Sequence, residues 1–469
     1  MMKLIIDNQL TLLNIPSDIK DWFAEQLTFT NPKFEEAAKY GRYIRNIPQH
    51  IKMYKSLPTG IIIPRGYLQM VEDTMIGQGL DLSIVDNRIL TPPVLVESDI
   101  KLRPYQKQAK FDLLAHPNGM LIAPAASGKT IMGLDLFASV RQKLLWLTHT
   151  NRLAKQVIER IVGTDEYPPV FPNIKKSAIG FIGGGKEIIG EQITIAMVQT
   201  LVRKELELLK LGKKFGITII DEAHHVPAST FLKVIGYFSS YYLYGLTATP
   251  YRRDKMEDIM FAVIGEANAK VKRRGLKEKG AIITPTVVKR LVPTSSAFGG
   301  INDYSLLLRE ILPANQIRLK MIVSDVVKEA KNNNYCIVIS LRKAYCEILF
   351  ARLNSELPNK VVIATGDYSQ NHNDAQVAEV DSGKVNVLVT TFELLGEGFD
   401  VPRLNRGFLV LPFREKSRVE QTVGRIQRPY EGKNDALLYD YVDEEIGVLK
   451  NQFIHRALAY RSLGIRIII

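Results

Sequence analysis

The sequence predicts an α/β fold with two tandem doubly wound parallel-sheet domains, preceded by a small α+β N-terminal domain. Short apolar segments alternate with helical segments from Leu121 to Thr249, which is typical of a parallel sheet covered by helices on both faces. The same alternation returns between Cys336 and Leu411. It is missing before Asp99, so that region forms a unit of its own. The expected domains are residues 1–98, 99–275 and 276–469.

Composition limits the possible classes of protein. The chain has 469 residues, too many for one hydrophobic core, and its 46% hydrophobic and 24% charged residues are ordinary for a globular protein. A net charge of +13 favours a polyanionic partner. We expect no membrane span and a cytoplasmic location (host cytoplasm if the chain is phage-encoded), because no long apolar run occurs. The two cysteines, Cys336 and Cys346, exclude a disulfide framework and are expected to be inert core thiols.

A loop of small residues stands between the strand-like segment 120–122 and the helical segment 131–137. Backbone N–H groups of such a loop, and of the helix that starts after it, can bind phosphates. Lys129 can reach the β and γ oxygens of a nucleotide, and the Thr130 hydroxyl can bind Mg²⁺. Ala123 replaces the first glycine of the usual pattern, but its small side chain still lets the loop close. The alternative is a chance turn between strand and helix. The residues expected to hold ATP are Ala125, Ala126, Ser127, Gly128, Lys129 and Thr130.

Two further side chains upstream are expected to contact the nucleotide. In Leu102–Gln106 the guanidinium of Arg103 and the amide of Gln106 can read the face and edge of a purine base. This signal is weak alone and gains weight from its position before Lys129.

A pair of acids follows the apolar strand 215–220. ATP hydrolysis needs a carboxylate near Mg²⁺ and a second group that orients and deprotonates water. Asp221 suits the metal and Glu222 suits the base, while His224 is expected to couple this site to neighbouring elements. The alternative is an acidic helix cap. The hydroxyls of segment 244–250 are expected to bond the Asp-Glu-Ala-His segment 221–224 on one side and the second domain on the other.

Polar residues at several strand ends predict a nucleic-acid path. Segments 148–151, 183–186 and 199–200 follow apolar strands, whose carboxyl ends meet at one edge of a parallel sheet. An extended sugar–phosphate backbone could lie there, although each segment could also be a plain capped turn. The N-terminal region interleaves basic residues with tyrosines, which suits phosphate contacts and base stacking. A solvated helical face with core tyrosines stays an equal alternative. The residues concerned are Lys33, Lys39, Arg42, Arg45, Lys52, Lys55 and Arg65 with Tyr40, Tyr43, Tyr54 and Tyr67.

The second α/β half lacks a Gly-Lys-Thr loop and is expected to complete the site of the first. Positions 421, 424, 425 and 428 are predicted to share one face of a helix. Gln421, Arg425 and Arg428 on that face match the charge of a transferring γ-phosphoryl group. The alternative is a basic surface helix. The basic segment 270–280 is predicted to be a connection or an exposed DNA-facing segment.

These motifs, in this order, resemble those of superfamily 2 helicases. The departures are Ala123 in motif I and Thr247 where motif III more often has serine. The wider sequence is similar to bacteriophage branch-migrating helicases of the UvsW type, and more distantly to XPB. The N-terminal segments 31–34 and 63–66 look like parts of the small double-strand-binding domain of that group. The matches are Arg103 and Gln106 (Q motif), 123–130 (motif I), 221–224 (motif II), 247–249 (motif III), 390–400 (motif V) and 421–428 (motif VI).

The resemblance implies two RecA-like lobes that share one ATP·Mg²⁺, with Gly398 and Asp400 of motif V also at the nucleotide. It implies an ATP-dependent DNA helicase or translocase that moves 3′→5′ and acts on forks, Holliday junctions and R-loops. The expected partner is branched or partly single-stranded DNA, and a monomer is expected. Three alternatives stay open. They are an RNA-remodelling ATPase, the duplex translocase subunit of a restriction-type system, and a DNA-binding protein with an inactive motor.

Overall fold

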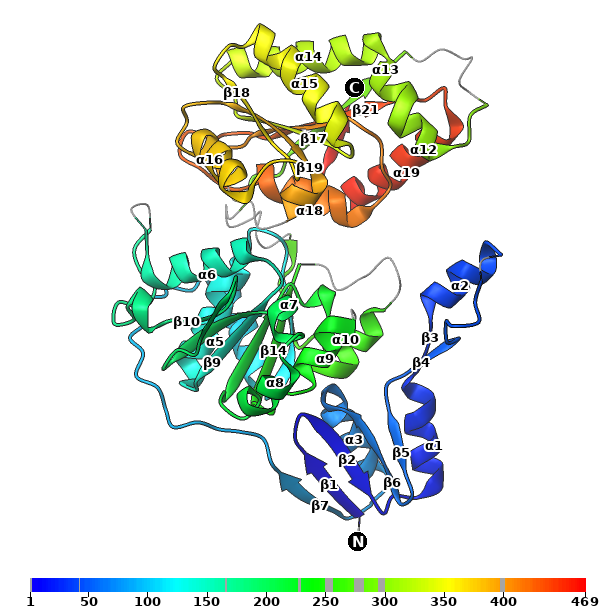
Figure 1. The fold of residues 1–469 in the computed structure, drawn as a ribbon, viewed down its shortest axis with the longest axis vertical. Helices are drawn as coiled ribbons and strands as arrows, with labels where there is room; N and C mark the ends of the chain where they lie inside the picture. The colour runs from blue at the N-terminus through cyan, green and yellow to red at the C-terminus, as the bar shows by residue number, and fades with distance from the viewer. Residues whose placement is uncertain are drawn as a thin grey trace. The chain divides into compact units, whose positions relative to one another are not determined.

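The computed structural model divides into two compact units, residues 1–124 with 128–271, and residues 272–469 with 125–127 (Figure 1). The predicted boundary between residues 275 and 276 lies outside the part of the chain that the structure describes. The described residues are 2–41, 43–164, 167–226, 229–248, 256–273, 282–293, 300–396 and 401–469.

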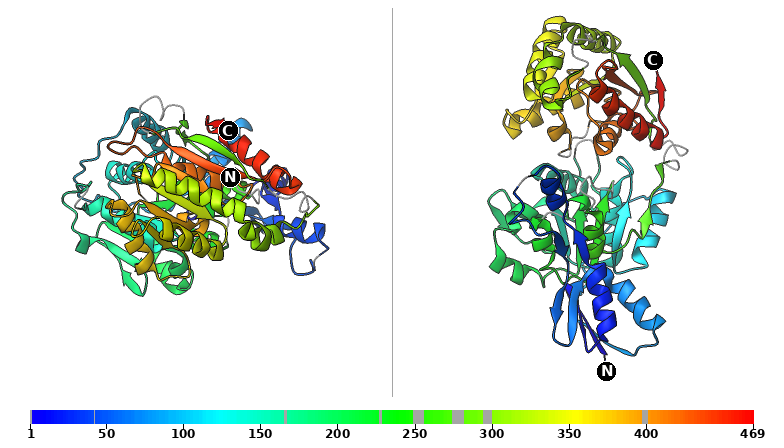
Figure 2. Two further views of the ribbon diagram at one scale, coloured as in Figure 1. Left: turned by 90° about the horizontal axis from the view of Figure 1, so that it is seen from above. Right: turned by 90° about the vertical axis from the view of Figure 1, so that its right-hand side faces the viewer.

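The N-terminal part of the first unit is α+β, as predicted. Its five strands pair in the order β5-β6-β2-β1-β7, antiparallel except for β1 with β7, and Figure 2 shows this blue sheet as a layer of its own. A separate two-stranded sheet joins β3 and β4. The elements are β1 (Met2–Ile6), β2 (Gln9–Leu13), α1 (Ser17–Gln26), β3 (Thr28–Thr30), α2 (Pro32–Lys39), β4 (His50–Lys52), β5 (Lys55–Leu57), β6 (Gly60–Pro64), η1 (Arg65–Tyr67), α3 (Leu68–Gly77) and β7 (Leu82–Asp86).

The rest of the first unit is the predicted doubly wound sheet. Eight strands pair in the order β11-β10-β12-β9-β13-β14-β8-β15. All pairs are parallel except β10 with β11, an antiparallel hairpin that the parallel-sheet prediction did not include. The elements are α4 (Pro104–Leu114), β8 (Asn118–Ile122), α5 (Lys129–Val140), β9 (Leu144–Thr148), α6 (Asn151–Val162), η2 (Lys176–Ala178), β10 (Gly180–Gly183), β11 (Lys186–Ile188), β12 (Ile193–Met197), α7 (Val198–Leu201), α8 (Glu205–Leu211), β13 (Ile217–Asp221), η3 (Ala223–His225), α9 (Ser229–Ile235), β14 (Tyr242–Thr247), α10 (Glu257–Ile264) and β15 (Ala269–Lys270).

The second unit is an all-parallel seven-stranded sheet in the order β18-β19-β17-β20-β21-β16-β22. The elements are β16 (Thr286–Leu291), α12 (Tyr304–Leu306), η5 (Leu307–Ile311), α13 (Leu312–Ala314), α14 (Gln316–Lys331), β17 (Cys336–Ser340), α15 (Lys343–Glu356), β18 (Val361–Ala364), α16 (Gln370–Asp381), β19 (Val387–Thr391), α17 (Phe392–Gly396), β20 (Arg406–Leu409), α18 (Lys416–Ile426), β21 (Leu437–Val442), α19 (Gly447–Ser462) and β22 (Arg466–Ile468).

The central strands are buried on both faces, which explains why they read as continuous apolar runs in the sequence. In β17, Val338 packs into one core with α14 and α15, and its neighbour Ile337 packs into a second core with α16 and α18. Both cysteines are buried free thiols, and burial raises the pKa of Cys346 to about 12. The prediction of inert core thiols is therefore confirmed.

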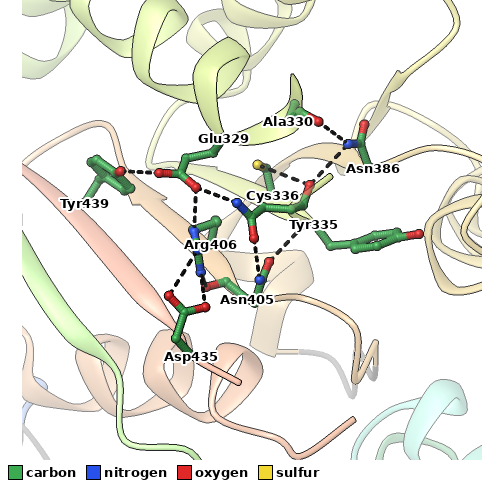
Figure 3. A network of polar contacts seen from close by, with 10 residues as sticks. Glu329, Ala330, Tyr335, Cys336, Asn386, Asn405, Arg406, Asp435 and Tyr439 are labelled. Carbon is green, nitrogen blue, oxygen red and sulfur yellow. Dashed lines mark hydrogen bonds and ion pairs between the residues drawn. The ribbon is translucent and has the colours of Figure 1, made fainter. Parts of the chain in front are cut away.

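Buried polar side chains close the second sheet at the amino ends of its strands (Figure 3). Arg406, the first residue of β20, donates to Glu329 at 2.6 Å and to Asp435 at 2.9 Å. The Tyr439 hydroxyl donates to the other carboxylate oxygen of Glu329 at 2.6 Å. Because each charge in this network has a partner of opposite sign, it stabilises structure, and a ligand edge is left to the opposite, carboxyl ends of the strands.

The N-terminal sheet docks on the first parallel-sheet domain through Arg65. Its side chain is buried and donates to the carbonyl oxygens of Ser240 at 2.6 Å and Tyr241 at 3.1 Å. At Gly66 a Cβ atom would lie 2.4 Å from the carbonyl oxygen of Ala262, so a larger residue would separate the two surfaces. The interpretation of Arg65 as a phosphate-binding residue is therefore wrong, because desolvation of the guanidinium is offset by protein carbonyls and not by nucleic acid.

Candidate active site

The phosphate loop follows β8 and ends where α5 begins at Lys129. Ala126 (φ 67°) and Gly128 (φ 82°) both have left-handed backbone conformations, which turn the chain sharply before the helix. A Cβ atom on residue 128 would lie 2.5 Å from Nε2 of Gln106, so glycine is required here twice over. The first N–H groups of α5 have no partner within the helix, which suits them to bind an anion.

Gln106 lies beside this loop, in the first turn of α4. Its Oε1 accepts a hydrogen bond from the Arg103 backbone N–H at 2.8 Å, and the side chain is buried. The amide oxygen therefore caps its own helix, and the Nε2 group faces Gly128. Arg103 is exposed. The structure brings Gln106 to the loop, and base recognition by this pair stays a prediction.

The predicted acids and the predicted lysine come together at the carboxyl edge of the sheet. Asp221 is the last residue of β13 and is buried, and its Oδ1 accepts from the Glu222 backbone N–H at 3.0 Å. The Nζ of Lys129 lies 4.0 Å from Oε1 of Glu222 and donates to the Ala123 carbonyl oxygen at 3.4 Å. Glu222 has a left-handed backbone (φ 49°), which costs a non-glycine residue about 1 kcal/mol or more. Such strain is typical of functional positions.

The two carboxylates have opposite electrostatic surroundings. Burial, with the adjacent charge of Glu222, raises the pKa of Asp221, although Lys129 opposes this shift. Burial also disfavours the charged form of Glu222, but Lys129 and His224 outweigh it and hold its pKa well below the usual range. A divalent cation beside Asp221 would favour its charged form.

The donor set fits ATP·Mg²⁺. The hydroxyl of Thr130 and the carboxylate of Asp221 are hard oxygen ligands, and Mg²⁺ usually takes one or two such groups together with substrate phosphates. Among the described residues no group of three or more His, Cys, Asp or Glu side chains could hold a metal ion. When bound, Mg²⁺ supplies charge neutralisation at the phosphate oxygens.

His224 links the acids to the next strand. Its Nδ1 lies 3.2 Å from Oε2 of Glu222 and shares a 3.2 Å hydrogen bond with the Thr247 hydroxyl at the end of β14. The expected contact between segment 244–250 and the Asp-Glu-Ala-His segment is therefore confirmed for Thr247, through His224. Thr249 lies outside the described residues.

The polar strand ends do lie at one edge. Strands β10, β12 and β9 are parallel neighbours, and Met197 pairs with Thr148 at their carboxyl ends. Thr150 caps α6 by accepting from the Leu153 backbone N–H at 3.2 Å, so the capped-turn interpretation holds for this residue. Gly183 pairs with Lys186 across the β10–β11 hairpin. Nucleic-acid binding along this edge stays a prediction.

The basic N-terminal residues fall into two groups. Tyr54 and Tyr67 pack against the hydrophobic core of the N-terminal sheet, as the alternative interpretation had it. Tyr40 and Tyr43 are 62% and 70% exposed, and Lys33, Lys39, Arg45, Lys52 and Lys55 are also exposed. Arg42 lies outside the described residues.

In the second unit the predicted basic helix is shorter than expected. Helix α18 ends at Ile426, so Arg428 does not share a helical face with Gln421 and Arg425. The reason is Pro429, because a proline disfavours the helical conformation of the residue before it. The Arg425 guanidinium donates to the Leu395 carbonyl oxygen at 2.8 Å. Gly398, Asp400 and most of the basic segment 270–280 lie outside the described residues.

Sequence reasoning missed two features near these sites. Gln427, between the two arginines, is buried, and its Oε1 accepts from the guanidinium of Arg273. The ring of His225 lies between those of His149 and His224, tilted by 48° and 37° to them. The second histidine after Asp-Glu-Ala was a visible signal, but its partner at residue 149 could not be found from spacing.

Family models match both parallel-sheet domains. Residues 99–252 match the family described as "Type III restriction enzyme, res subunit", and residues 318–429 match "Helicase conserved C-terminal domain". These matches agree with the two RecA-like helicase domains predicted from the sequence.

Named relatives refine this class. The chain is 29% identical to the "DNA 3'-5' translocase XPB2" of Sulfurisphaera tokodaii, over 45% of this chain and 45% of that protein. It is 22% identical to a probable helicase of Escherichia phage T5, over 84% and 82%. It is also 22% identical to the "ATP-dependent DNA helicase uvsW" of Enterobacteria phage T4, over 72% and 68%. The predicted resemblance to superfamily 2 helicases of the UvsW and XPB type is therefore confirmed.

The match spans less than half the length of the first archaeal relatives, 45% of the Sulfurisphaera protein and 32% of a Halobacterium salinarum helicase. Among solved structures, a fragment of a putative HsdR subunit of a type I restriction enzyme from Vibrio vulnificus aligns with TM-score 0.56 at 18% identity. It covers 76% of this chain and 66% of the fragment, and it supports the fold alone. Within the described residues, no helix is both long and apolar enough to cross a bilayer.

Proposed function

We propose that this protein is a DNA helicase or translocase that hydrolyses ATP to unwind or branch-migrate forks, Holliday junctions and R-loops, with 3′→5′ polarity. The observation that carries the proposal is the contact chain from Lys129 through Glu222 and His224 to Thr247. It supplies a phosphate-binding cation, a carboxylate kept charged and a link to the next strand.

In this mechanism Lys129 and Thr130 bind ATP·Mg²⁺, and Asp221 holds the metal directly or through water. Glu222 orients the attacking water and accepts its proton, and its lowered pKa keeps the carboxylate in the charged, hydrogen-bond-accepting form at neutral pH. Arg103 and Gln106 bind the base, and Gln421, Arg425 and Arg428 stabilise the γ-phosphoryl group when the second lobe closes. Each cycle of closure and release then moves one lobe along the nucleic acid.

DNA is the proposed substrate because the Sulfurisphaera, Halobacterium and phage T4 relatives carry it in their names and because the exposed N-terminal side chains suit it. Lys39 lies over the ring of Tyr40, with its Nζ 5.9 Å from the ring centroid, beside further exposed cations. Contacts between such cations and DNA phosphates carry no sequence information. Movement along DNA should therefore depend little on the base sequence. We propose that the chain acts as a monomer.

The first test is Arg428→Ala. An arginine finger is worth roughly 10³–10⁵ in rate, so we expect ATP hydrolysis to be nearly abolished while nucleotide binding is mostly kept. The exposed Arg461, at the end of α19, provides the matched control Arg461→Ala, which should hydrolyse ATP normally. Normal hydrolysis by Arg428→Ala would refute the role of the second lobe.

The second test identifies the substrate. Fork, Holliday junction, R-loop and plain duplex DNA are compared, each with ATP and with a non-hydrolysable analogue, and duplex RNA serves as competitor. We expect ATP-dependent remodelling of branched DNA. Stimulation of hydrolysis by RNA in preference to branched DNA would favour the RNA-remodelling ATPase.

A duplex translocase is the second candidate, because the matched family over residues 99–252 is named for a restriction subunit. Such a protein would displace a bound third strand from plain duplex DNA and leave the duplex paired. Strand separation on a fork would exclude it.

A further inference from the structure

Three imidazole rings lie in a row between the ends of two neighbouring strands. His149 follows β9, and His224 and His225 belong to η3, which follows β13. The two strands pair in parallel, with Leu147 opposite Ile220. The ring centroids of His149 and His225 are 4.2 Å apart, and those of His225 and His224 are also 4.2 Å apart. These are close contacts for aromatic rings, so His225 fills the space between the other two.

The two ends of this row lie beside different proposed sites, the catalytic base and the nucleic-acid contact. At one end, His224 lies 3.2 Å from the carboxylate of Glu222, the proposed base. At the other end, His149 stands between Thr148 and Thr150, in the segment proposed to contact the sugar–phosphate backbone. The Nδ1 of His149 is buried without a hydrogen-bond partner in the described part of the chain. Packing against His225 is therefore a main constraint on this ring.

The row can carry a displacement because its rings are in close contact. Burial lowers the pKa of His149, which favours the neutral ring. Packed rings do not compress, so a shift of the β9 end moves the neighbouring ring or opens a gap. The ring of Phe231, whose centroid is 6.3 Å from that of His225, limits movement on a further side.

We propose that His225 is a positioning residue that transmits nucleic-acid binding at segment 148–151 to Glu222, through the packed rings of His149, His225 and His224. The inference rests on the proposed function and deepens it, since it names the contact by which DNA would stimulate hydrolysis. Coupling between two sites by such a contiguous, packed chain typically changes a linked property 5- to 150-fold, by about 1–3 kcal/mol.

The test compares His225→Ala with His225→Phe in the full-length chain. ATP hydrolysis is measured without nucleic acid and with saturating forked DNA, and DNA affinity is measured by fluorescence anisotropy. We expect His225→Ala to lower the DNA stimulation factor about tenfold. Its basal rate, its KM for ATP and its DNA affinity should match those of the wild type. His225→Phe, which keeps a ring in the row, should keep most of the stimulation.

Further variants keep the test decisive. His225→Gln, which is polar but has no ring, should lose stimulation like His225→Ala and replaces it if the alanine variant unfolds. His116→Ala is the matched control, since that side chain is exposed in the same unit, and should behave as the wild type. Unchanged stimulation in both ringless variants, or an equal loss in His225→Phe, overturns the inference. If the wild type itself shows no DNA-stimulated hydrolysis, the proposed function fails instead.

Discussion

Both parallel-sheet domains carry buried acids in or directly after a strand, and the surroundings of these acids differ. Asp221 ends β13, Asp440 lies within β21 and Asp443 follows β21. In the second unit, Asp440 accepts from Arg456 at 2.8 Å through both carboxylate oxygens and from the Tyr460 hydroxyl at 2.8 Å. Asp443 accepts from Arg318 at 2.6 Å, and neither side chain of that pair is exposed. In the first unit, Glu222 lies 4.0 Å from Lys129, and Asp221 accepts a backbone N–H.

The difference separates structural acids from chemical ones. When a buried carboxylate forms an ion pair with a guanidinium in good geometry, the attraction between the two charges offsets the cost of desolvation. The pKa of Asp221 is raised because Lys129 and one backbone N–H do not compensate for burial of the carboxylate and for the adjacent charge of Glu222. Retaining such a group lowers stability, so its use is best sought in a ligand, here ATP·Mg²⁺. Substitutions that remove the charge of one residue in each unit test this distinction between structural and chemical acids.

The largest expected effect is on catalysis, from Glu222→Gln. This change keeps the shape of the side chain but removes the base, so turnover of ATP should fall roughly 10²–10⁴-fold. Nucleotide affinity should remain close to that of the wild type, while the melting temperature should fall modestly, because the amide loses the charge that Lys129 and His224 stabilise. Steady-state kinetics and a thermal melt test this, with Glu356→Gln on the exposed end of α15 as control. A large drop in melting temperature with normal turnover would make Glu222 a structural acid.

The next effect is on stability, from Arg456→Leu. Removing one partner leaves Asp440 charged and buried, which typically costs about 3–5 kcal/mol of unfolding free energy. Urea denaturation measures this loss. The double variant Arg456→Leu with Asp440→Leu should recover much of it, because two apolar side chains leave no buried charge. A loss below about 1 kcal/mol in the single variant would mean that this pair resembles an exposed one.

The smallest effect is a gain in stability from Asp221→Asn. The folded state raises the pKa of this carboxyl group, so the charged form costs stability at neutral pH, and the amide removes that cost. In Mg²⁺-free buffer the free energy of unfolding should equal or exceed that of the wild type by about 1 kcal/mol. As pH rises from the ordinary carboxyl pKa through the raised value, the wild type should lose a stabilising contribution that the variant lacks. Destabilisation of the variant at pH 7 would contradict this account.

The sequence by itself determined the α/β class, the strands that carry the motifs, and the phosphate loop before α5. These features follow from local rules, since apolar runs mark buried parallel strands and the turn before Lys129 needs small residues. A local rule could also have shown that Arg428 lies beyond the helix, because Pro429 disfavours the helical conformation of the residue before it. The prediction that Arg428 shares a helical face with Gln421 and Arg425 was therefore avoidable.

Only the tertiary structure decided which charged side chains form ion pairs or hydrogen bonds within the protein and which are left for a ligand. Arg65 reaches Ser240 across 175 positions of the chain, and Arg318 reaches Asp443 across 125. The contact of His149 with His225 exists because β9 and β13 are neighbours in the sheet. Strand order sets such distances, and no spacing along the chain encodes strand order. An acidic residue can therefore be part of a buried structural ion pair in one domain and the proposed catalytic base in the other.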